Sequence, residues 1–211
     1  MSEPLSEILP LFPLNVVLFP QSRLHLHIFE ERYKALIGET VIADSFFGIN
    51  LLQESEILTV GCTAAVHEVV KRYEDGRMDI VVEGRRRYHL QNIVDAPHPY
   101  HCGRVTWLED VPEETDEELR ITAVRLHNEF ITTVFTGVVE KVDAADIRKG
   151  RAFHLVQKCG MDLRQRQSML AMRSENQRLR FLVRHLETVM PLLSSRKSVE
   201  EFARNDGYIR Q

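Results

Sequence analysis

The feature that most constrains this chain is a proline-punctuated apolar stretch from Leu9 to Pro20. Three of its residues, Pro10, Pro13 and Pro20, lack the amide hydrogen that a helix needs, and each favours extended backbone in the residue before it. An apolar and extended segment satisfies its backbone polar groups by pairing with other strands. The sequence therefore predicts that this stretch is built into a sheet, and it excludes a single helix.

The residues directly after this stretch alternate with the two-residue period of a half-buried strand. One face carries three aliphatic residues and the other carries histidines and an aromatic residue: Leu24, Leu26 and Ile28 against His25, His27 and Phe29. Residues 30–37 then predict a short helix, with Gly38 placed to end it.

Further short strands are predicted downstream, separated by turns. They cover residues 46–52, 62–73, 77–83, 85–94 and 100–108. Asp75-Gly76 lies between two alternating runs, which is a strong hairpin signal, and Gly84 marks a bulge or bend. Several short strands with little helix between them predict a closed or nearly closed barrel.

The pattern changes to helical at Val111-Pro112. A first helix is expected from an N-cap at Thr115 to near Gly137, a second over 143–158, a third from about Asp162, and a last one that stops at Pro191. We therefore divide the chain into a β-barrel at 1–111, a helical subdomain at 112–193 and a polar tail at 194–211.

Composition narrows the class of protein. The formal net charge of -4 gives no global attraction to nucleic acid or to an anionic membrane. No apolar run approaches the roughly 20 residues that span a bilayer. The N-terminus lacks the basic segment of a secretory signal, and three distant cysteines do not suggest a disulfide framework. A cytoplasmic protein with no membrane partner is expected.

The opening residues also carry a recognisable series of motifs. These are LPLFPL at 9–14, VLFP at 17–20 and IFEERY at 28–33. The series resembles the opening signature of the Lon protease N-terminal (substrate-binding) domain family, in its small stand-alone form. Gln21 stands where that family usually has glycine, and His25 and Glu31 stand where prolines are common.

The resemblance implies an α+β fold, in which a PUA-like β-barrel is followed by a helical subdomain. It also implies non-enzymatic recognition of unfolded or apolar polypeptide segments in protein quality control, alone or as an adaptor, with a protease or a chaperone as a further partner. The chain contains no G-x-x-x-x-G-K-[ST] loop and no G-x-S-x-G elbow, so the ATPase and peptidase modules of full Lon proteases are not expected.

A peptide-binding patch is the candidate site. Its proposed members are the aromatic, proline and histidine residues of the opening segment and one arginine: Phe12, Pro13, Phe19, His25, His27, Phe29, Arg32 and Tyr33. Each apolar member also has an interpretation as a core residue. The two histidines are either a polar rim of a binding groove or solvated strand residues.

The alternatives to peptide binding are other classes of function, namely RNA binding, metal binding and catalysis. Basic later helices are compatible with an RNA-binding PUA-like module, although they could instead meet the acidic run at 109–118 within the fold. His67-Glu68 only approaches a metal motif, and His98, His101 and Cys102 lack a second cluster, so no metal and no cofactor is expected. No nucleophile, base and orienting group can be named together, so no catalytic residue is expected.

Overall fold

The computed structural model describes residues 7–135 and 139–194. The chain divides into two compact units between Glu109 and Asp110, two residues before the boundary expected from the sequence. Most of the expected polar tail, from residue 195 on, lies outside the described residues.

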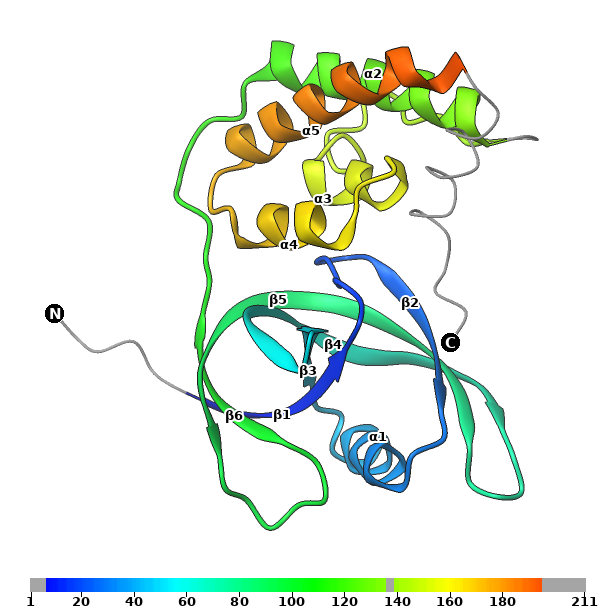
Figure 1. Ribbon diagram of the computed structural model, residues 1–211, viewed down its shortest axis with the longest axis vertical. Coiled ribbons are helices and arrows are strands. Elements are labelled where there is room, and N and C mark those ends of the chain that lie inside the picture. The colour runs from blue at the N-terminus through cyan, green and yellow to red at the C-terminus, as the bar shows by residue number, and fades with distance from the viewer. Residues whose placement is uncertain (1–6, 136–138, 195–211) are drawn as a thin grey trace, which may run out of the picture. The chain divides into compact units, whose positions relative to one another are not determined.

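The first unit is a six-stranded mixed sheet with one helix (Figure 1). Its elements are β1 (Glu7–Leu14), β2 (Arg23–Ile28), α1 (Glu31–Ala43), β3 (Phe47–Gln53), β4 (Glu56–Arg72), β5 (Met78–Val94) and β6 (Cys102–Trp107). The strand order is β2-β5-β4-β3-β1-β6, and β6 also pairs with β5. This last pairing closes five strands into a ring, while β2 lies outside it against the first half of β5.

The proline-punctuated stretch is part of this sheet, as predicted, from Leu9 to Leu14, whereas residues 15–20 lie outside the strands. The second half of β1 pairs in parallel with β3, from Leu11 opposite Gly48 to Leu14 opposite Leu51. The first half pairs antiparallel with β6, from Glu7 opposite Val105 to Pro10 opposite Cys102. The part of the stretch up to Leu14 thus obtains its backbone partners from two strands distant in the sequence, as an extended segment requires.

One tyrosine fills much of the interior of the ring. The Tyr88 side chain is fully buried, and its hydroxyl donates to Oδ1 of Asn50. Gly48 and Gly61 leave the space for its ring, because a Cβ at either position would overlap the phenol. Asn50 in turn donates from Nδ2 to the Leu58 carbonyl at 2.8 Å, so the buried polar groups are paired.

The helix α1 is longer than predicted. It continues through Gly38 to Ala43 and ends at Asp44, which adopts a left-handed conformation with φ of 46°. The prediction that Gly38 ends the helix is wrong, because a helix tolerates an internal glycine at a cost of about 1 kcal/mol. Burial of Leu36, Ile37 and Thr40 on both sides of Gly38 keeps the helix on the sheet.

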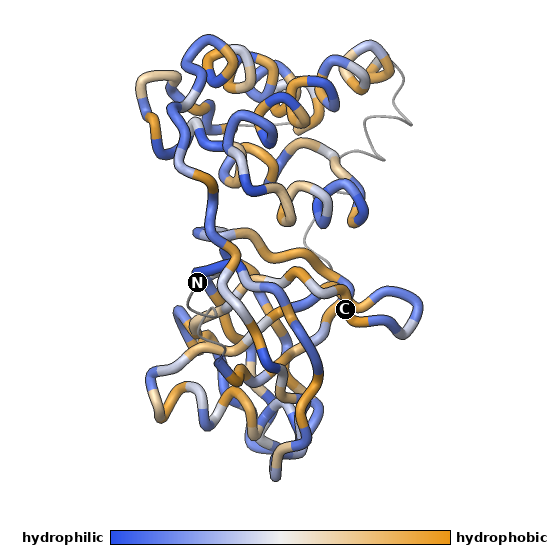
Figure 2. The backbone as a smooth tube through the Cα atoms, turned by 90° about the vertical axis from the view of Figure 1, so that its left-hand side faces the viewer, coloured by the Kyte–Doolittle hydropathy of each residue, from blue (hydrophilic) through white to orange (hydrophobic). Residues whose placement is uncertain are grey.

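The second unit is helical. Its elements are α2 (Glu117–Val134), α3 (Ala152–Leu155), the 3₁₀ turn η1 (Val156–Lys158), α4 (Leu163–Ala171), α5 (Glu175–Val189) and the 3₁₀ turn η2 (Met190–Ser194). Figure 2 shows hydrophobic and hydrophilic residues alternating along these helices. The α2 helix packs against α5. Asp116, one residue after the expected Thr115, caps α2 by accepting from the Leu119 amide.

The helix predicted over 143–158 is wrong for its first half. Asp143 Oδ1 accepts the Ala145 amide at 2.8 Å, and Asp146 Oδ1 accepts the amides of Arg148 and Lys149 at 3.0 Å. These side-chain bonds favour turns over a helix. Ile147, in this first half, is 58% exposed. Helical structure begins only at Ala152.

A buried arginine on α5 binds two carboxylates of the helical unit. The Arg178 side chain is only 2% exposed, and its guanidinium lies 2.8 Å from Asp110 Oδ1 and 2.7 Å from Glu175 Oε2. The same group lies 4.3 Å from the centre of the Phe153 ring. Nearby, Glu113 accepts hydrogen bonds from the Ser174 hydroxyl and the Asn176 amide. Part of the acidic run therefore meets a basic helix within the fold.

Three free cysteines are buried, namely Cys62 and Cys102 in the barrel unit and Cys159 in the helical unit. Burial raises the pKa of the Cys62 thiol to about 12, so this thiol stays protonated at neutral pH.

Replacing Arg178 with alanine should destabilise the helical unit by roughly 3–5 kcal/mol, because it leaves the carboxylate of Glu175 buried without its partner. Urea unfolding followed by circular dichroism at 222 nm measures this loss. Arg180→Ala, at an exposed position on the same helix, is the control and should stay within about 0.5 kcal/mol of the wild type. Equal losses in the two variants would contradict the assignment.

The His127 side chain predicts how stability depends on pH. It is 4% exposed on α2, and its pKa falls to about 4, chiefly through burial and then through the nearby His154. The unfolded chain titrates near 6.5, so it takes up this proton first as pH falls. The helical unit should therefore be most stable above pH 6.5 and lose about 2–3 kcal/mol through this histidine by pH 4.

His127→Phe should flatten that dependence in urea unfolding measured from pH 7 to pH 4. Burial also lowers the pKa of His154 and His185, so a smaller slope should remain. His89→Phe, at an exposed position of β5, should leave the profile as it is in the wild type. An unchanged slope in the His127 variant would disprove the role of this side chain.

Candidate functional site

The strand β2 forms an edge of the barrel sheet. It pairs with β5 over six residue pairs, from Arg23 opposite Glu83 to Ile28 opposite Met78. No other strand of the described part of the chain pairs with it. The outer edge of such a strand presents backbone N–H and C=O groups to which a further strand can bond.

The alternation predicted for this strand is confirmed. Ile28 is buried and Leu24 and Leu26 are half-buried, whereas His25 and His27 are exposed. Phe29, immediately after the strand, is 54% exposed. His25 takes part in an interaction, so we do not count its ring as available to a ligand.

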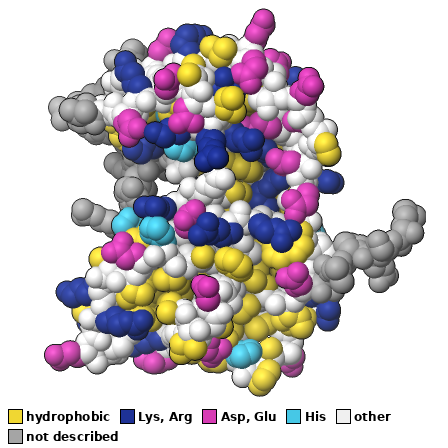
Figure 3. Space-filling model, turned by 180° about the vertical axis from the view of Figure 1, so that it is seen from behind, with side chains coloured by type: hydrophobic (Ala, Val, Ile, Leu, Met, Phe, Trp, Pro, Cys, Tyr) yellow, Lys and Arg dark blue, Asp and Glu magenta, His cyan; other side chains and the backbone are white. Residues whose placement is uncertain are grey.

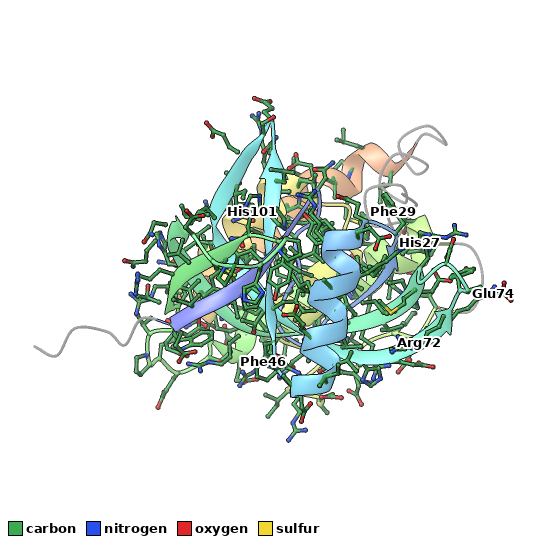
Figure 4. The ribbon with its side chains drawn as sticks, turned by 90° about the horizontal axis from the view of Figure 1, so that it is seen from below. His27, Phe29, Phe46, Arg72, Glu74 and His101 are labelled. Carbon is green, nitrogen blue, oxygen red and sulfur yellow. The ribbon has the colours of Figure 1, made fainter. Side chains whose placement is uncertain are left out.

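A polar and aromatic cluster lies next to Phe29. His27 Nδ1 is 2.6 Å from Asp79 Oδ1, and the Tyr73 hydroxyl donates to Asp79 Oδ2 at 2.7 Å. The His27 ring stacks near Phe29 at 6.1 Å between centroids and meets Tyr73 edge-on at 5.9 Å. Figure 4 shows His27 and Phe29 side by side at one end of α1. These contacts fix the orientation of the His27 ring beside the exposed Phe29.

One carboxylate and two cationic side chains surround the Tyr73 ring. Hydrogen bonds from His27 and then Tyr73 lower the pKa of Asp79. Lys71 Nζ lies 4.4 Å from the centre of the Tyr73 ring, and Arg77 Cζ lies 5.0 Å from it. The carboxylate therefore stays ionised at neutral pH, and both cations lie against the aromatic ring.

Four of the eight residues proposed from the sequence lie in the interior of the barrel unit. Phe12, Pro13, Phe19 and Tyr33 are buried. The Phe12 ring stacks on Tyr33 with 3.9 Å between centroids, so these side chains pack the interior. These four side chains belong to the core of the barrel unit, and their contact with a peptide stays a prediction.

Arg32, another proposed residue, is half-buried. Its guanidinium pairs with Glu30 at 2.8 Å and lies 4.5 Å from the centre of the Tyr33 ring.

The sequence reasoning missed a second exposed apolar group, at the other end of α1. Ile42 is 89% exposed and Phe46 is 48% exposed, with Val41 beside them. Figure 4 places Phe46 at the opposite end of α1 from Phe29. The signal was present, because Ile42 lies off the helix face that carries Leu36 and Thr40. Figure 3 shows hydrophobic side chains gathered over the barrel unit on the face it displays.

The remaining candidate sites do not assemble. Within residues 7–135 and 139–194, no three His, Cys, Asp or Glu side chains stand where they could jointly hold a metal ion. His98 lies 3.6 Å from Glu39, and Cys102 is buried. Among the helices described, none is long and apolar enough to cross a bilayer.

The fold and the edge strand define a class, an α+β protein in which a PUA-like barrel is followed by a helical unit. Several solved structures share the fold, among them the following two. A Lon N-terminal domain protein from Xanthomonas campestris matches with a TM-score of 0.66 at 24% identity, over 84% of this chain and 98% of its own. The N-terminal domain of a Mycobacterium avium complex Lon protease matches with a TM-score of 0.64 at 18% identity, over 86% and 98%.

The family model of the ATP-dependent protease La (LON) substrate-binding domain matches residues 8–188. The chain belongs to this family. No match to a curated protein sequence was found.

Tyr73→Phe removes one donor to Asp79 and should raise the pKa of that carboxyl towards the ordinary value of about 3.9. Carbon-13 NMR of the Asp79 carboxyl against pH measures the shift. Tyr100→Phe, which removes a hydroxyl bonded to Glu39 instead, should leave Asp79 unaffected. The cluster would be refuted if the two variants gave the same Asp79 titration.

Proposed function

We propose that the chain recognises extended, apolar segments of other polypeptides and catalyses no reaction on them. It does so in protein quality control, either alone or as an adaptor for a protease or a chaperone. Membership of the LON substrate-binding domain family supports a polypeptide ligand. The proposal places the chain in the cytoplasm, where free thiols such as its three cysteines persist.

The observation that carries this proposal is the exposed Phe29 at the end of an edge strand. An extended peptide that adds to β2 gains backbone hydrogen bonds, which do not depend on its sequence. Phe29 then offers an aromatic surface to one apolar side chain of the peptide. Backbone pairing with a single apolar contact suits a promiscuous binder of unfolded segments.

His27 supports the same geometry. Its bond to Asp79 and its position between Phe29 and Tyr73 fix the ring beside the edge. A peptide at this edge meets a rigid aromatic surface, which reduces the entropy lost on binding.

The RNA-binding alternative has less support. Arg178, one of the cations on the basic helices, is buried against Asp110 and Glu175 and is not available to phosphate. Salt dependence separates the two functions, because phosphate contacts weaken steeply with ionic strength and apolar contacts do not.

The test is the affinity of an apolar, unfolded peptide for Phe29→Ser. We expect roughly tenfold weaker binding by fluorescence anisotropy, because the variant removes the aromatic contact. Phe46→Ser is the matched control: it has the same residue type and similar exposure, at the opposite end of α1. It should bind as the wild type does.

A second arm tests the strand pairing itself. The same peptide, N-methylated at alternate residues, keeps its side chains but loses donors needed to pair with β2, so it should bind weakly. Equal effects of the two Phe variants would point to a generic apolar surface and overturn the edge assignment. Binding that disappears with added salt and ignores both variants would favour RNA.

A further inference from the structure

The helical unit contains a pocket that the peptide-binding proposal does not use. It has a volume of about 300 Å³ and is formed by α2, the segment 140–149 and the α3–η1 turn. Its lining is rich in basic side chains: His127, Ile131, Glu140, Lys141, Val142, Lys149, His154, Gln157 and Lys158. This volume is at the lower end of the range for small-molecule sites.

The charges in this pocket are unbalanced. Three lysines and one carboxylate, Glu140, line the pocket, which gives the lining a formal charge of +2 with the histidines neutral. The Asp146 carboxylate, outside the lining, also acts on Lys149 and His154. Glu140 is bound to Lys149 at 3.0 Å and is largely exposed. Lys141 and Lys158 form no ion pair with any residue that the structure describes. Two cationic groups are thus available to a ligand.

A buried histidine with one unpartnered ring nitrogen lies in the wall of this pocket. His127 is almost completely buried in the pocket wall, and its Nδ1 has no hydrogen-bond partner within the described chain. A buried polar atom without a partner is rare in a folded protein and calls for an explanation. The pKa of His154 is also lowered, first by burial and then by Lys149. The positive groups of the pocket therefore repel one another. A bound anion relieves that repulsion.

The segment that carries two of the lysines is held firmly to α2. The Asn128 side chain bonds both the carbonyl and the amide of Val142, at 2.8 and 2.9 Å. The buried Arg120 donates to the Ala144 carbonyl at 2.8 Å. A Cβ at Gly150 would lie 2.6 Å from the Arg120 guanidinium, so glycine permits this close packing. The lysines therefore extend from a preorganised segment.

We infer that this pocket binds a small dianion of phosphate type, either free phosphate or a small phosphate monoester. A phosphoryl group carries about −1.5 to −2 charges at neutral pH, which matches the surplus of the lining. Lys141 and Lys158 bind its oxygens as charge-assisted donors. The neutral His127 ring lines the site, and Ile131 and Val142 give an apolar wall for a short organic group.

The experiment is a titration of the full chain with inorganic phosphate, glycerol 2-phosphate and acetate, each against sodium chloride of equal ionic strength. Calorimetry gives the affinity, and NMR of the histidine rings shows where the anion binds. Both phosphate compounds should bind saturably and shift the His127 and His154 resonances. Tighter binding of the monoester identifies an organic phosphate, and equal binding identifies free phosphate.

Variants test the individual contacts. Lys141→Gln and Lys158→Gln, both at exposed positions, should each weaken phosphate binding roughly tenfold or more. His127→Phe keeps an aromatic ring in the wall but removes the nitrogens, so it should weaken binding without unfolding the unit. Arg180→Gln is the control, an exposed cation on α5 outside the lining, and should bind as the wild type does.

The inference is overturned if phosphate gives no saturable signal beyond that of chloride, or if acetate binds as tightly. It is also overturned if Arg180→Gln loses as much affinity as the lysine variants, since that would be general screening. Peptide binding by Phe29 should be unchanged in Lys158→Gln, so failure of this inference is distinguishable from failure of the proposed function.

Discussion

The backbone pairing of β5 with three other strands holds the barrel unit together. One edge of β5 bonds to β4, while the other edge bonds first to β2 and then to β6. Because β6 also pairs with β1, this arrangement closes the ring around Tyr88. Closure uses the edges of five strands and leaves β2 outside the ring. The candidate site thus follows from how the barrel closes.

The two units use different chemistry to hold their parts. The barrel depends on strand pairing around an interior in which Tyr88 and Asn50 bond to each other. The helical unit instead fixes its segments with buried polar side chains, of which Arg178, Arg120 and Asn128 are the clearest. Such networks are rigid because every member needs its partners. That rigidity keeps several lysines close together, an arrangement that a mobile segment would not maintain.

Patterns of neighbouring residues correctly predicted the elements that depend on interactions between residues close in the sequence. The alternation at 24–29 and the Asp75-Gly76 turn, where Gly76 has φ of 82°, are in place. The extent of α1 and the turns at 143–151 could not be predicted from periodicity, because burial and side-chain bonds outweigh propensity there. The site was only partly predictable. Phe12 and Phe29 are both apolar residues of the opening segment, and only the packing of Phe12 on Tyr33 distinguishes them.

Because the cysteines are divided between the two units, local opening of each unit can be measured separately. Cys159 is the thiol of the described helical unit, whereas Cys62 and Cys102 belong to the barrel. A thiol reagent reaches a buried sulfur only after the surrounding structure opens, so the labelling rate of each site measures a local opening free energy. Mass spectrometry of the modified peptides would then show which half of the molecule loosens first under heat or denaturant, without any engineered probe.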